Sequence, residues 1–260
     1  MPEGDTLART AATLRRWLAG REVTAAETRV DGLAAGRLVG RYVAEVEALG
    51  KHLLVRFDSG HALHTHLRMT GSWHVYPEGR PWRRPPSQAR LVLRCGERVA
   101  VCCNAPVVEL LTPEAVAVHP ALVRLGPDVL GRPLDTAGIR RRARRRPASL
   151  ALGELLLDQH VVAGIGNIWR CEALHVAGLH PWTPQGEVND VELEALVMQA
   201  ARLMHASTVG RGRPAPRRVY DRAGRPCRRC GALVVARRQG PDARTSYWCP
   251  KCQPAAGAGR

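Results

Sequence analysis

The sequence lacks any long apolar segment. No stretch approaches the roughly 18–20 uninterrupted apolar residues that a membrane-spanning helix needs, and the first residues do not follow the basic-then-apolar order of a signal peptide. We therefore expect a cytosolic protein with no membrane anchor. Acidic residues are also few: the chain has 23 Asp and Glu and 39 Lys and Arg, which gives a formal net charge of +16. Such an imbalance is typical of a protein with a polyanionic partner, nucleic acid or anionic lipid.

The eight cysteines do not suggest a disulfide framework, because the cytosol is reducing. Four of them form two matched pairs, Cys227-x2-Cys230 and Cys249-x2-Cys252. Two such knuckles can place four thiolates tetrahedrally around zinc, whereas four unrelated reduced cysteines would not share this spacing. A site closed by four cysteines stabilises a fold and does not activate water, so we predict one structural Zn²⁺ in a C-terminal zinc ribbon. The other four cysteines are expected to be buried.

Arginine is concentrated around these cysteines. Eleven arginines and two acidic residues lie between Arg211 and Arg244, which predicts that the ribbon contacts phosphate or a nucleic-acid groove. Arg140–Arg146 forms a second basic cluster. For this second cluster, a solvated basic surface and a DNA contact are both open interpretations. RNA binding through the ribbon has no support beyond the charge.

At 260 residues the chain is longer than one typical domain. Apolar residues recur at helical spacing from Asp5 to Leu18, with Asp5 or Thr6 as the expected cap. The pattern then alternates, which predicts a β-rich domain built as a sandwich, with a Pro- and Arg-rich loop over Pro77–Ser87. The alternating segments are Val43–Leu49, Leu53–Phe57, Leu63–Leu67, Leu91–Cys95 and Val99–Cys103.

Helical spacing returns after Thr112. It predicts helices over Leu150–Leu157 and Asn167–Val176, and a third helix with Leu193 to Met204 along one face. Gly210–Pro216 then breaks the pattern. We therefore predict an α+β fold in three parts: an N-terminal helix plus β-sandwich domain over residues 1–112, a helical domain over 113–210 and the zinc ribbon over 217–253.

A glycine-containing turn, Gly164-Ile-Gly-Asn167, precedes the second of these helices. Asn is a favoured helix cap, and the backbone N–H groups at a helix start form a site for phosphate. An ordinary capped turn would have the same residues. Taken alone the residues favour that ordinary turn, and the basic composition of the chain adds weight to the phosphate site.

The N-terminus offers a nucleophile. Pro2 follows the initiator Met, and a small second residue allows Met1 to be removed, which leaves a free secondary amine. An α-amino group has a reference pKa of about 8, so it is unprotonated near neutrality far more often than a lysine side chain. A secondary amine condenses with a sugar C1′ to an iminium that keeps its positive charge. Glu3 lies beside it as a possible acid or base. Met-Pro-Glu would also serve as nothing more than a stable terminus.

These features, taken in chain order, resemble the formamidopyrimidine-DNA glycosylase/endonuclease VIII family along nearly the whole chain. The opening Met1–Thr6 is similar to its endonuclease VIII branch. Four further segments are similar to family motifs: Gly50–Leu53 to a β-strand lysine motif, His66–Gly71 to a DNA-facing loop, Leu155–Pro181 to the helix-two-turns-helix and Val219–Gln253 to the zinc finger. Five motifs in the family's order are far more specific than any one of them.

The resemblance implies a bacterial enzyme of base excision repair, cytoplasmic and associated with the nucleoid, with damaged DNA as its partner. Nothing in the sequence suggests assembly, so we expect a monomer. It implies a bifunctional DNA glycosylase and AP lyase in which Pro2 forms a Schiff base with deoxyribose. Glu3 is then the acid/base, and Lys51 handles a proton and meets a phosphate.

The resemblance also implies the DNA-binding residues. His66, Asn167 and Arg244 would contact the phosphates that flank the lesion. Met69 would fill the gap that the flipped nucleotide leaves in the base stack, since an open gap costs a few kcal/mol. Taken singly, Lys51 is expected to be a solvated strand lysine, His66 a strand residue and Met69 a core residue.

One segment departs from the family pattern. Asn104–Leu110 stands where the formamidopyrimidine branch carries an Asp-x-Arg-Arg-Phe-Gly run, so the Arg and Phe wedges beside the orphaned base are missing. This favours oxidised pyrimidines over 8-oxoguanine as substrates, with an 8-oxoguanine-preferring glycosylase as the alternative. A non-catalytic damaged-DNA-binding protein on the same scaffold is another alternative. It would keep the basic ribbon and Asn167 but would not need Pro2, Glu3 and Lys51 together.

Overall fold

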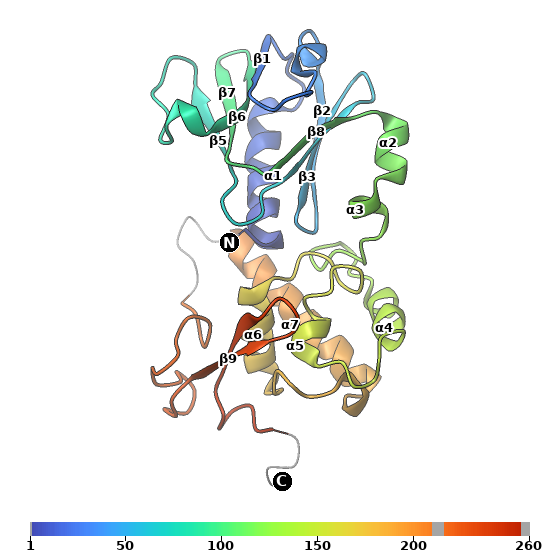
Figure 1. The fold of residues 1–260 in the computed structure, drawn as a ribbon, viewed down its shortest axis with the longest axis vertical. Helices are drawn as coiled ribbons and strands as arrows, with labels where there is room; N and C mark the ends of the chain where they lie inside the picture. The colour runs from blue at the N-terminus through green and yellow to red at the C-terminus, as the bar shows by residue number, and fades with distance from the viewer. Residues whose placement is uncertain (1, 210–215, 256–260) are drawn as a thin grey trace. The chain divides into compact units, whose positions relative to one another are not determined.

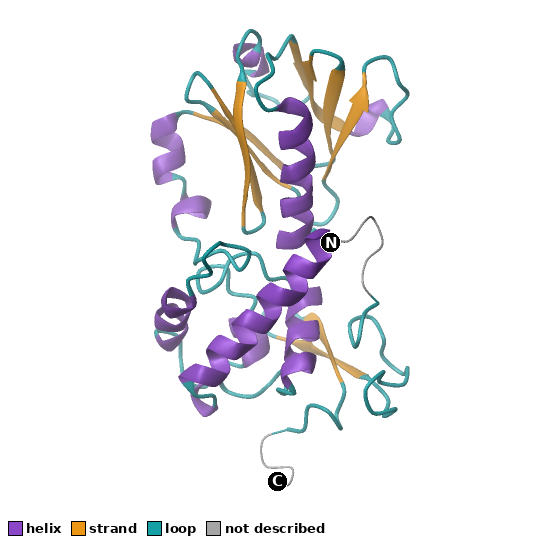
Figure 2. Ribbon diagram, turned by 180° about the vertical axis from the view of Figure 1, so that it is seen from behind, coloured by secondary structure: helices purple, strands orange, loops and turns teal. Residues whose placement is uncertain are grey.

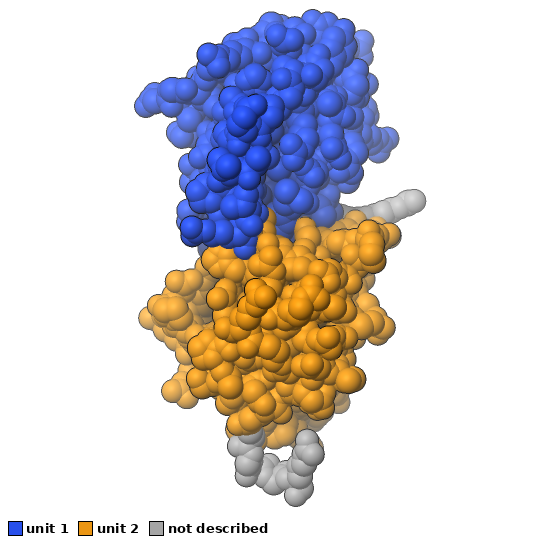
Figure 3. All heavy atoms as spheres, turned by 90° about the vertical axis from the view of Figure 1, so that its right-hand side faces the viewer, with its two compact units in different colours: residues 1–124 blue, residues 125–260 orange. Residues whose placement is uncertain are grey.

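The structure, a computed structural model, describes residues 2–209 and 216–255, so nearly all of the predicted linker Gly210–Pro216 lies outside the described residues. The chain divides into two compact units, Met1–Arg124 and Leu125–Arg260, which Figure 3 shows in separate colours. Across the described residues no helix combines the length and the apolar character that a bilayer crossing requires.

Unit 1 contains the helix α1 and a sandwich of two four-stranded antiparallel sheets (Figure 1). One sheet has the strand order β1-β6-β7-β5 and the other β2-β3-β4-β8. This arrangement confirms the predicted sandwich. The helices are α1 (Gly4–Leu18), α2 (Pro113–Val118) and α3 (Pro120–Val123), and the strands are β1 (Ala25–Thr28), β2 (Val43–Leu49), β3 (His52–Phe57), β4 (Ala62–His66), β5 (Ser72–Pro77), β6 (Ala89–Cys95), β7 (Arg98–Cys103) and β8 (Val107–Leu111).

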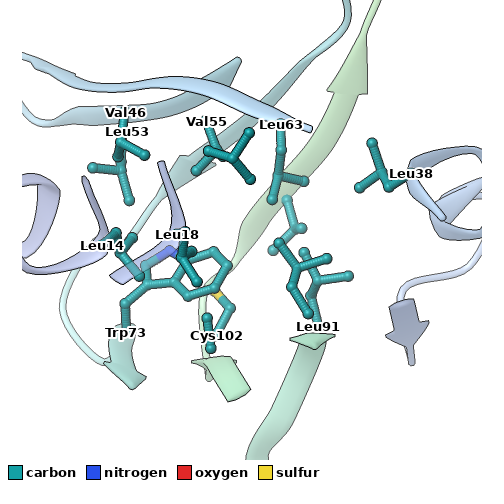
Figure 4. Packing of buried hydrophobic residues seen from close by; sticks show 14 of the residues in the cluster. Leu14, Leu18, Leu38, Val46, Leu53, Val55, Leu63, Trp73, Leu91 and Cys102 are labelled. Carbon is teal, nitrogen blue, oxygen red and sulfur yellow. The ribbon is translucent and has the colours of Figure 1, made fainter. Parts of the chain in front are cut away.

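The apolar face of α1 fills the space between the two sheets. Figure 4 shows Leu14 and Leu18 between Val46 and Leu53 of one sheet and Trp73 of the other. A fully buried leucine stabilises the fold by about 1.5–3 kcal/mol, so this face fixes the helix and, with it, the residues just before the helix.

The start of α1 differs from the prediction. The helix begins at Gly4, with Glu3 at the cap position, and neither Asp5 nor Thr6 caps it. Asp5 instead lies in the first turn, where its negative charge interacts favourably with the positive end of the helix dipole. It also forms an ion pair with Arg9 at 2.9 Å.

Unit 2 packs α4, α6 and α7 around one apolar core, and Figure 2 shows α7 as its long helix. The predicted helix over 150–157 is wrong in extent, because only the single turn α5 forms there. The elements are α4 (Thr136–Arg144), α5 (Leu152–Leu155), α6 (Asn167–Ala177), α7 (Asp190–Val209), β9 (Val235–Gln239) and β10 (Arg244–Trp248).

The basic cluster Arg140–Arg146 is largely engaged within unit 2. Arg144 donates to Asp190 at 2.9 Å and to the carbonyl of Val188, and Arg146 donates to Asp158 at 2.8 Å. Arg140 lies 3.3 Å from Glu194. These contacts tie α4 to α7 and to neighbouring loops, so most of this cluster is bound to partners within the unit and is not a freely solvated charge.

Candidate functional site

The N-terminal residues are held by the start of α1. Glu3 is 1% exposed, and its carbonyl oxygen accepts hydrogen bonds from the N–H groups of Thr6 at 2.9 Å and Leu7 at 3.1 Å. Pro2 is half-buried directly before it, while Met1 lies outside the described residues. Pro2 therefore lies at the N-terminal end of α1, where the helix dipole places a partial positive charge. This partial charge disfavours a positive charge on the Pro2 nitrogen.

Lys51 lies in the two-residue turn between β2 and β3, closed by the pair Leu49 and His52. The expectation of a strand lysine is therefore wrong by one residue. Gly50 has a φ of +58°, which a side chain would disfavour, so glycine suits this turn. Lys51 and Lys251 are the only lysines of an arginine-rich chain. An ammonium group can give up a proton under mild conditions and a guanidinium cannot, so Lys51 suits proton transfer.

His66 ends β4 next to this turn. Its Nδ1 accepts a hydrogen bond from the backbone N–H of Arg68 at 3.2 Å, so the neutral ring carries its proton on Nε2. Burial is the main cause, and the positive charge of Arg68 the next, of a pKa of His66 that is lowered to about 4. His66 is thus a neutral N–H donor around neutral pH, a group that can donate to a phosphate oxygen.

Met69 projects from the turn that follows β4. It is 67% exposed, so the expectation that a methionine here belongs to the core is wrong. The turn is tight, because the N–H of Gly71 donates to the carbonyl of Leu67 at 2.8 Å. A Cβ at Gly71 would lie 2.6 Å from that carbonyl oxygen, so only glycine fits. An exposed apolar side chain on a tight turn is a suitable wedge for a base stack.

The segment 104–110 that departs from the family pattern continues from β7 into β8. Asn104 has a φ of +49°, and its carbonyl accepts a hydrogen bond from the Thr70 hydroxyl at 3.2 Å. From Val107 onward the segment is an edge strand paired with β4.

In unit 2, Asn167 is the first residue of α6, with Gly166 at the cap position. The expectation that Asn167 caps the helix is wrong. Its Nδ2 instead donates to the carbonyl of Thr245 in β10 at 2.9 Å, and its Oδ1 is buried with no hydrogen-bond partner among the described residues. Asn167 therefore joins the start of α6 to the ribbon.

Two buried charged residues of α6 also hold the ribbon. Arg170 is fully buried and donates to the carbonyls of Gly153 at 3.1 Å and Arg244 at 3.3 Å. Glu172 is 1% exposed and accepts hydrogen bonds from three consecutive backbone N–H groups, those of residues 218–220. Sequence reasoning missed both roles, because the partners are backbone atoms 17 to 74 residues away.

Arg244 begins β10. Its Nε lies 3.3 Å from Asp242, and the side chain is 39% exposed. A pocket of about 260 Å³ beside it is also lined by Glu154, Arg170 and Gln239. The Arg244 guanidinium is thus available to an anion from solvent, while its backbone is fixed by Arg170.

The four ribbon cysteines lie together as a possible metal site. Their sulfur atoms are all within 4.8 Å of one another, with 4.0 Å between Cys227 and Cys252 and 3.4 Å between Cys230 and Cys249. Four sulfurs at about 2.3 Å from a tetrahedral ion would be separated by about 3.8 Å, so the donor set fits. The backbone N–H of Arg229 and Nε2 of His175, each 3.4 Å from the Cys227 sulfur, supply outer contacts. The remaining four cysteines are buried as expected.

A group of histidines around β4 was not predicted as a site. His64 lies opposite Glu109 of β8, and His52 of β3 lies opposite His66. His119, between α2 and α3, contacts the same glutamate. The alternation of His64 and His66 was visible in the sequence, but only the strand register brings in Glu109.

Two family models match the chain. The formamidopyrimidine-DNA glycosylase N-terminal domain matches residues 1–106, and the formamidopyrimidine-DNA glycosylase H2TH domain matches residues 125–213. The probable endonuclease 8 2 of Streptomyces coelicolor is 40% identical over 97% of this chain and 94% of its own length. A DNA-(apurinic or apyrimidinic site) lyase of Mycolicibacterium smegmatis is 37% identical over 98% of this chain and 100% of its own length. The endonuclease 8 of Escherichia coli is 31% identical over 97% of this chain and 100% of its own length.

The fold is also that of a solved structure. A formamidopyrimidine-DNA glycosylase of Lactococcus lactis, solved with DNA that contains an AP site, superposes with a TM-score of 0.83 over 97% of this chain and all of that chain, at 20% identity. Fold and site together define a DNA-glycosylase scaffold: a helix with a sandwich, a helical unit and a four-cysteine ribbon.

The chain belongs to the formamidopyrimidine-DNA glycosylase family, and its curated relatives lie in the endonuclease 8 branch. The family resemblance and the α+β fold class predicted from the sequence are thereby confirmed.

Proposed function

We propose that this protein is a bifunctional DNA glycosylase and AP lyase of base excision repair, which removes oxidised bases from damaged DNA and then cuts the strand. The names of the relatives, endonuclease 8 and DNA-(apurinic or apyrimidinic site) lyase, support both activities. We further propose that it acts as a monomer in the bacterial cytoplasm, at the nucleoid. The Pro2–Glu3 pair at the start of α1 is the observation on which the catalytic assignment rests.

The nucleophile in this proposal is the secondary amine of Pro2 after removal of Met1. Its nitrogen forms a bond to C1′ as the glycosidic bond breaks, and the base leaves with the bonding electrons and a proton. The α1 dipole supports the neutral amine that this attack needs. The nitrogen lone pair then expels O4′ from C1′, O4′ takes a proton, and the opened sugar carries the iminium. The iminium withdraws electrons, which permits β- and then δ-elimination and leaves a one-nucleotide gap with phosphates at both ends.

Glu3 and Lys51 move the protons. The burial of Glu3 supports an acid/base role, because a buried carboxyl is able to hold a proton at neutral pH and then donate it. Lys51 lies in a tight turn beside His52 and His66, and this position supports the proposal that it meets a phosphate and exchanges a proton.

The DNA contacts come from both units. His66 offers its Nε2–H, Asn167 lies at the start of α6, and Arg244 presents a partly exposed guanidinium, all of which are groups that bind phosphate oxygens. Met69 fills the place of the flipped nucleotide. The edge strand in place of an Arg- and Phe-bearing loop supports oxidised pyrimidines as the preferred substrates.

Zinc is the metal that we propose for Cys227, Cys230, Cys249 and Cys252. A site of four thiolates has no open position, so zinc here would hold the β9–β10 ribbon in shape and would not take part in the chemistry. The arginines that the ribbon carries would then be held in a fixed arrangement toward phosphate.

Borohydride trapping on DNA that contains an abasic site tests the nucleophile. The wild-type protein should be trapped, and mass spectrometry of the digest should find the deoxyribose adduct on Pro2. A Pro2→Leu variant, whose bulky second residue keeps Met1 on the chain, should lose trapping. Equal trapping by Pro2→Leu, or an adduct on another residue, would refute the assignment.

Two further variants separate the steps. Glu3→Gln keeps the amine, so it should still be trapped on a preformed abasic site while it fails to excise an intact oxidised base. Glu22→Gln changes an exposed acid elsewhere in unit 1 and should behave as wild type. If Glu3→Gln excises thymine glycol at the wild-type rate, Glu3 is not the acid/base.

A further inference from the structure

Three potential metal ligands converge in unit 1, outside the four-cysteine site. Oε2 of Glu109 lies 2.8 Å from Nδ1 of His64 and 3.2 Å from Nε2 of His119. One potential ligand atom from each of the three residues lies within 4.8 Å of those of the other two. They come from three segments: β4, β8 and the junction of α2 and α3. At that junction the carbonyl of His119 accepts the N–H groups of Leu122 and Val123, which fixes its backbone.

We propose that His64, Glu109 and His119 form a binding site for one divalent transition-metal ion. Two imidazoles and a carboxylate are the ligands that zinc, cobalt and ferrous ions accept. Ligand atoms bonded to one such ion at about 2.0–2.1 Å lie about 3.0–3.4 Å apart. The two Glu109 contacts, at 2.8 Å and 3.2 Å, are close to this range, and the imidazole nitrogens, within 4.8 Å of each other, would move to the same separation as the ion binds. This site goes beyond the proposed repair function and does not depend on it.

The charges at this site favour a cation. Glu109 is 43% exposed at its side chain, and among the described residues its ion-pair partners are the two imidazoles alone, with no arginine or lysine. His64 is 1% exposed, and its Nδ1 lies 2.8 Å from this carboxylate, so a ligand nitrogen and the negative charge lie side by side. The Glu109 carboxylate therefore has no arginine or lysine as an ion-pair partner among the described residues, although the chain is strongly basic, and its negative charge is available to a metal ion.

An outer contact orients the buried ligand. Nε2 of His64 lies 2.9 Å from Nδ1 of His52, and the two rings are stacked. Metal-binding histidines usually have such a partner on the second ring nitrogen, which fixes the tautomer. Without a metal, Glu109 must accept from Nδ1–H of His64, so Nε2 of His64 accepts from Nδ1–H of His52. With a metal on Nδ1 of His64, both tautomers reverse.

The site is open enough for an ion to enter and to keep water. Three protein ligands leave at least one coordination position free, unlike the closed four-cysteine site. The His119 side chain is 17% exposed, and Glu109 also lines a surface cavity of about 480 Å³. The donor set has no thiolate, so it should take cobalt without the sulfur-to-metal absorption that a cysteine site gives.

Cobalt titration of protein whose cysteines are already filled with zinc tests the site. The wild-type protein should take up one further Co²⁺ per chain, with visible d–d absorption and no sulfur-to-metal band. Glu109→Gln and His119→Gln should each weaken this uptake by roughly tenfold or more, because even the loss of an outer contact to a ligand usually weakens metal binding by about that factor. His61→Gln removes a histidine of the same unit that is outside the three-ligand group, and it should bind as wild type.

Nitrogen-15 chemical shifts of the histidine rings give a second measurement on the same samples. Addition of Zn²⁺ or Co²⁺ should reverse the tautomers of His64 and His52 in the wild type and leave them unchanged in Glu109→Gln. No metal uptake beyond the cysteine site, or equal uptake by wild type and folded Glu109→Gln, would overturn the proposal. The histidines would then form only a hydrogen-bonded group next to His66. This outcome would leave the proposed repair function untouched.

Discussion

Asn167 and Thr245 are joined by a 2.9 Å hydrogen bond from the Asn167 side-chain amide to the Thr245 carbonyl. The bond links the first residue of α6 to β10, so the helix start and the ribbon hairpin share one contact. Because Oδ1 of Asn167 is buried and has no partner among the described residues, this single bond sets the orientation of the amide. The two phosphate-binding elements proposed for unit 2 are therefore coupled through Asn167.

We predict that Asn167→Asp damages both stability and DNA binding. The substitution replaces the donor by a carboxylate oxygen that faces a carbonyl oxygen, so the free energy of unfolding should fall by about 1–3 kcal/mol. The added negative charge should weaken binding to DNA by roughly tenfold or more, since it would lie beside phosphate. Urea unfolding of the zinc-loaded protein and fluorescence anisotropy on labelled duplex DNA measure the two effects.

Asn189→Asp is the matched control for this change. Asn189 accepts the N–H of Glu192 at 2.9 Å as the cap of α7, and aspartate caps a helix as well as asparagine does. Its unfolding and DNA binding should equal those of the wild type. Asn167→Asp with wild-type stability would show that the bond to Thr245 contributes nothing.

Glu172→Gln is predicted to loosen the chain that leads into the ribbon. The carboxylate accepts from the N–H groups of Arg218, Val219 and Tyr220 at 2.9–3.0 Å, and the amide of glutamine would turn a donor toward one of them. We expect a loss of about 1.5–3 kcal/mol in the free energy of unfolding, since these are hydrogen bonds to a buried charge. Glu187→Gln, at an exposed site, should change it by less than about 0.5 kcal/mol. Equal effects of the two variants would contradict this prediction.

The parts of the fold that could be predicted are those whose apolar spacing matches their burial. The spacing of Leu7, Ala11, Leu14 and Leu18 predicted α1, and all four are buried. The helix α4 was missed because only a few of its residues face the core, Ile139 and Ala143 among them, while arginines dominate its sequence. The apolar run over 150–157 predicted a longer helix than α5, because buried loop segments are as apolar as buried helices.

The candidate site could be predicted where the residues lie close together in sequence. The spacing of the two cysteine pairs predicts a four-cysteine metal site, and Pro2 and Glu3 are adjacent in the sequence. The joins between distant segments could not be predicted, because they depend on strand register and on backbone partners. Glu109 meets His64 only through the pairing of β4 with β8, and Asn167 turns toward β10 and does not cap its own helix.

Met69→Ala is predicted to separate activity from stability. The side chain is 67% exposed, so its truncation should change the free energy of unfolding by less than about 0.5 kcal/mol. Excision from duplex DNA should fall by roughly tenfold or more, because the gap in the base stack would no longer be filled. Incision of single-stranded DNA should change little, since no stack is opened there.

Met198→Ala provides the comparison, because Met198 is a methionine of unit 2 that is 40% exposed and lies outside the proposed DNA contacts. Its excision rate should be that of the wild type. A Met69→Ala protein that excises from duplex DNA as fast as Met198→Ala would remove Met69 from the proposed wedge role.

Chelation of zinc should release the ribbon thiols and leave those of the sandwich protected. Cys95, Cys102 and Cys103 are buried in unit 1, and burial raises the pKa of Cys95 to about 11 and that of Cys102 higher still, so few thiolates exist at pH 8 to react.

Native, zinc-loaded protein should therefore react slowly with a thiol reagent, and a strong chelator should make the four cysteines of the metal site react fast. DNA affinity should fall in parallel, because the arginines of β9 and Arg244 lose their fixed positions. Trp248, whose ring lies 5.0 Å from that of Trp182, supplies a fluorescence signal next to Cys249, with Trp248→Phe as the control for its assignment. Fast reaction of all four ribbon thiols before any chelator is added, in protein that binds DNA fully, would show that the ribbon holds its shape without a metal.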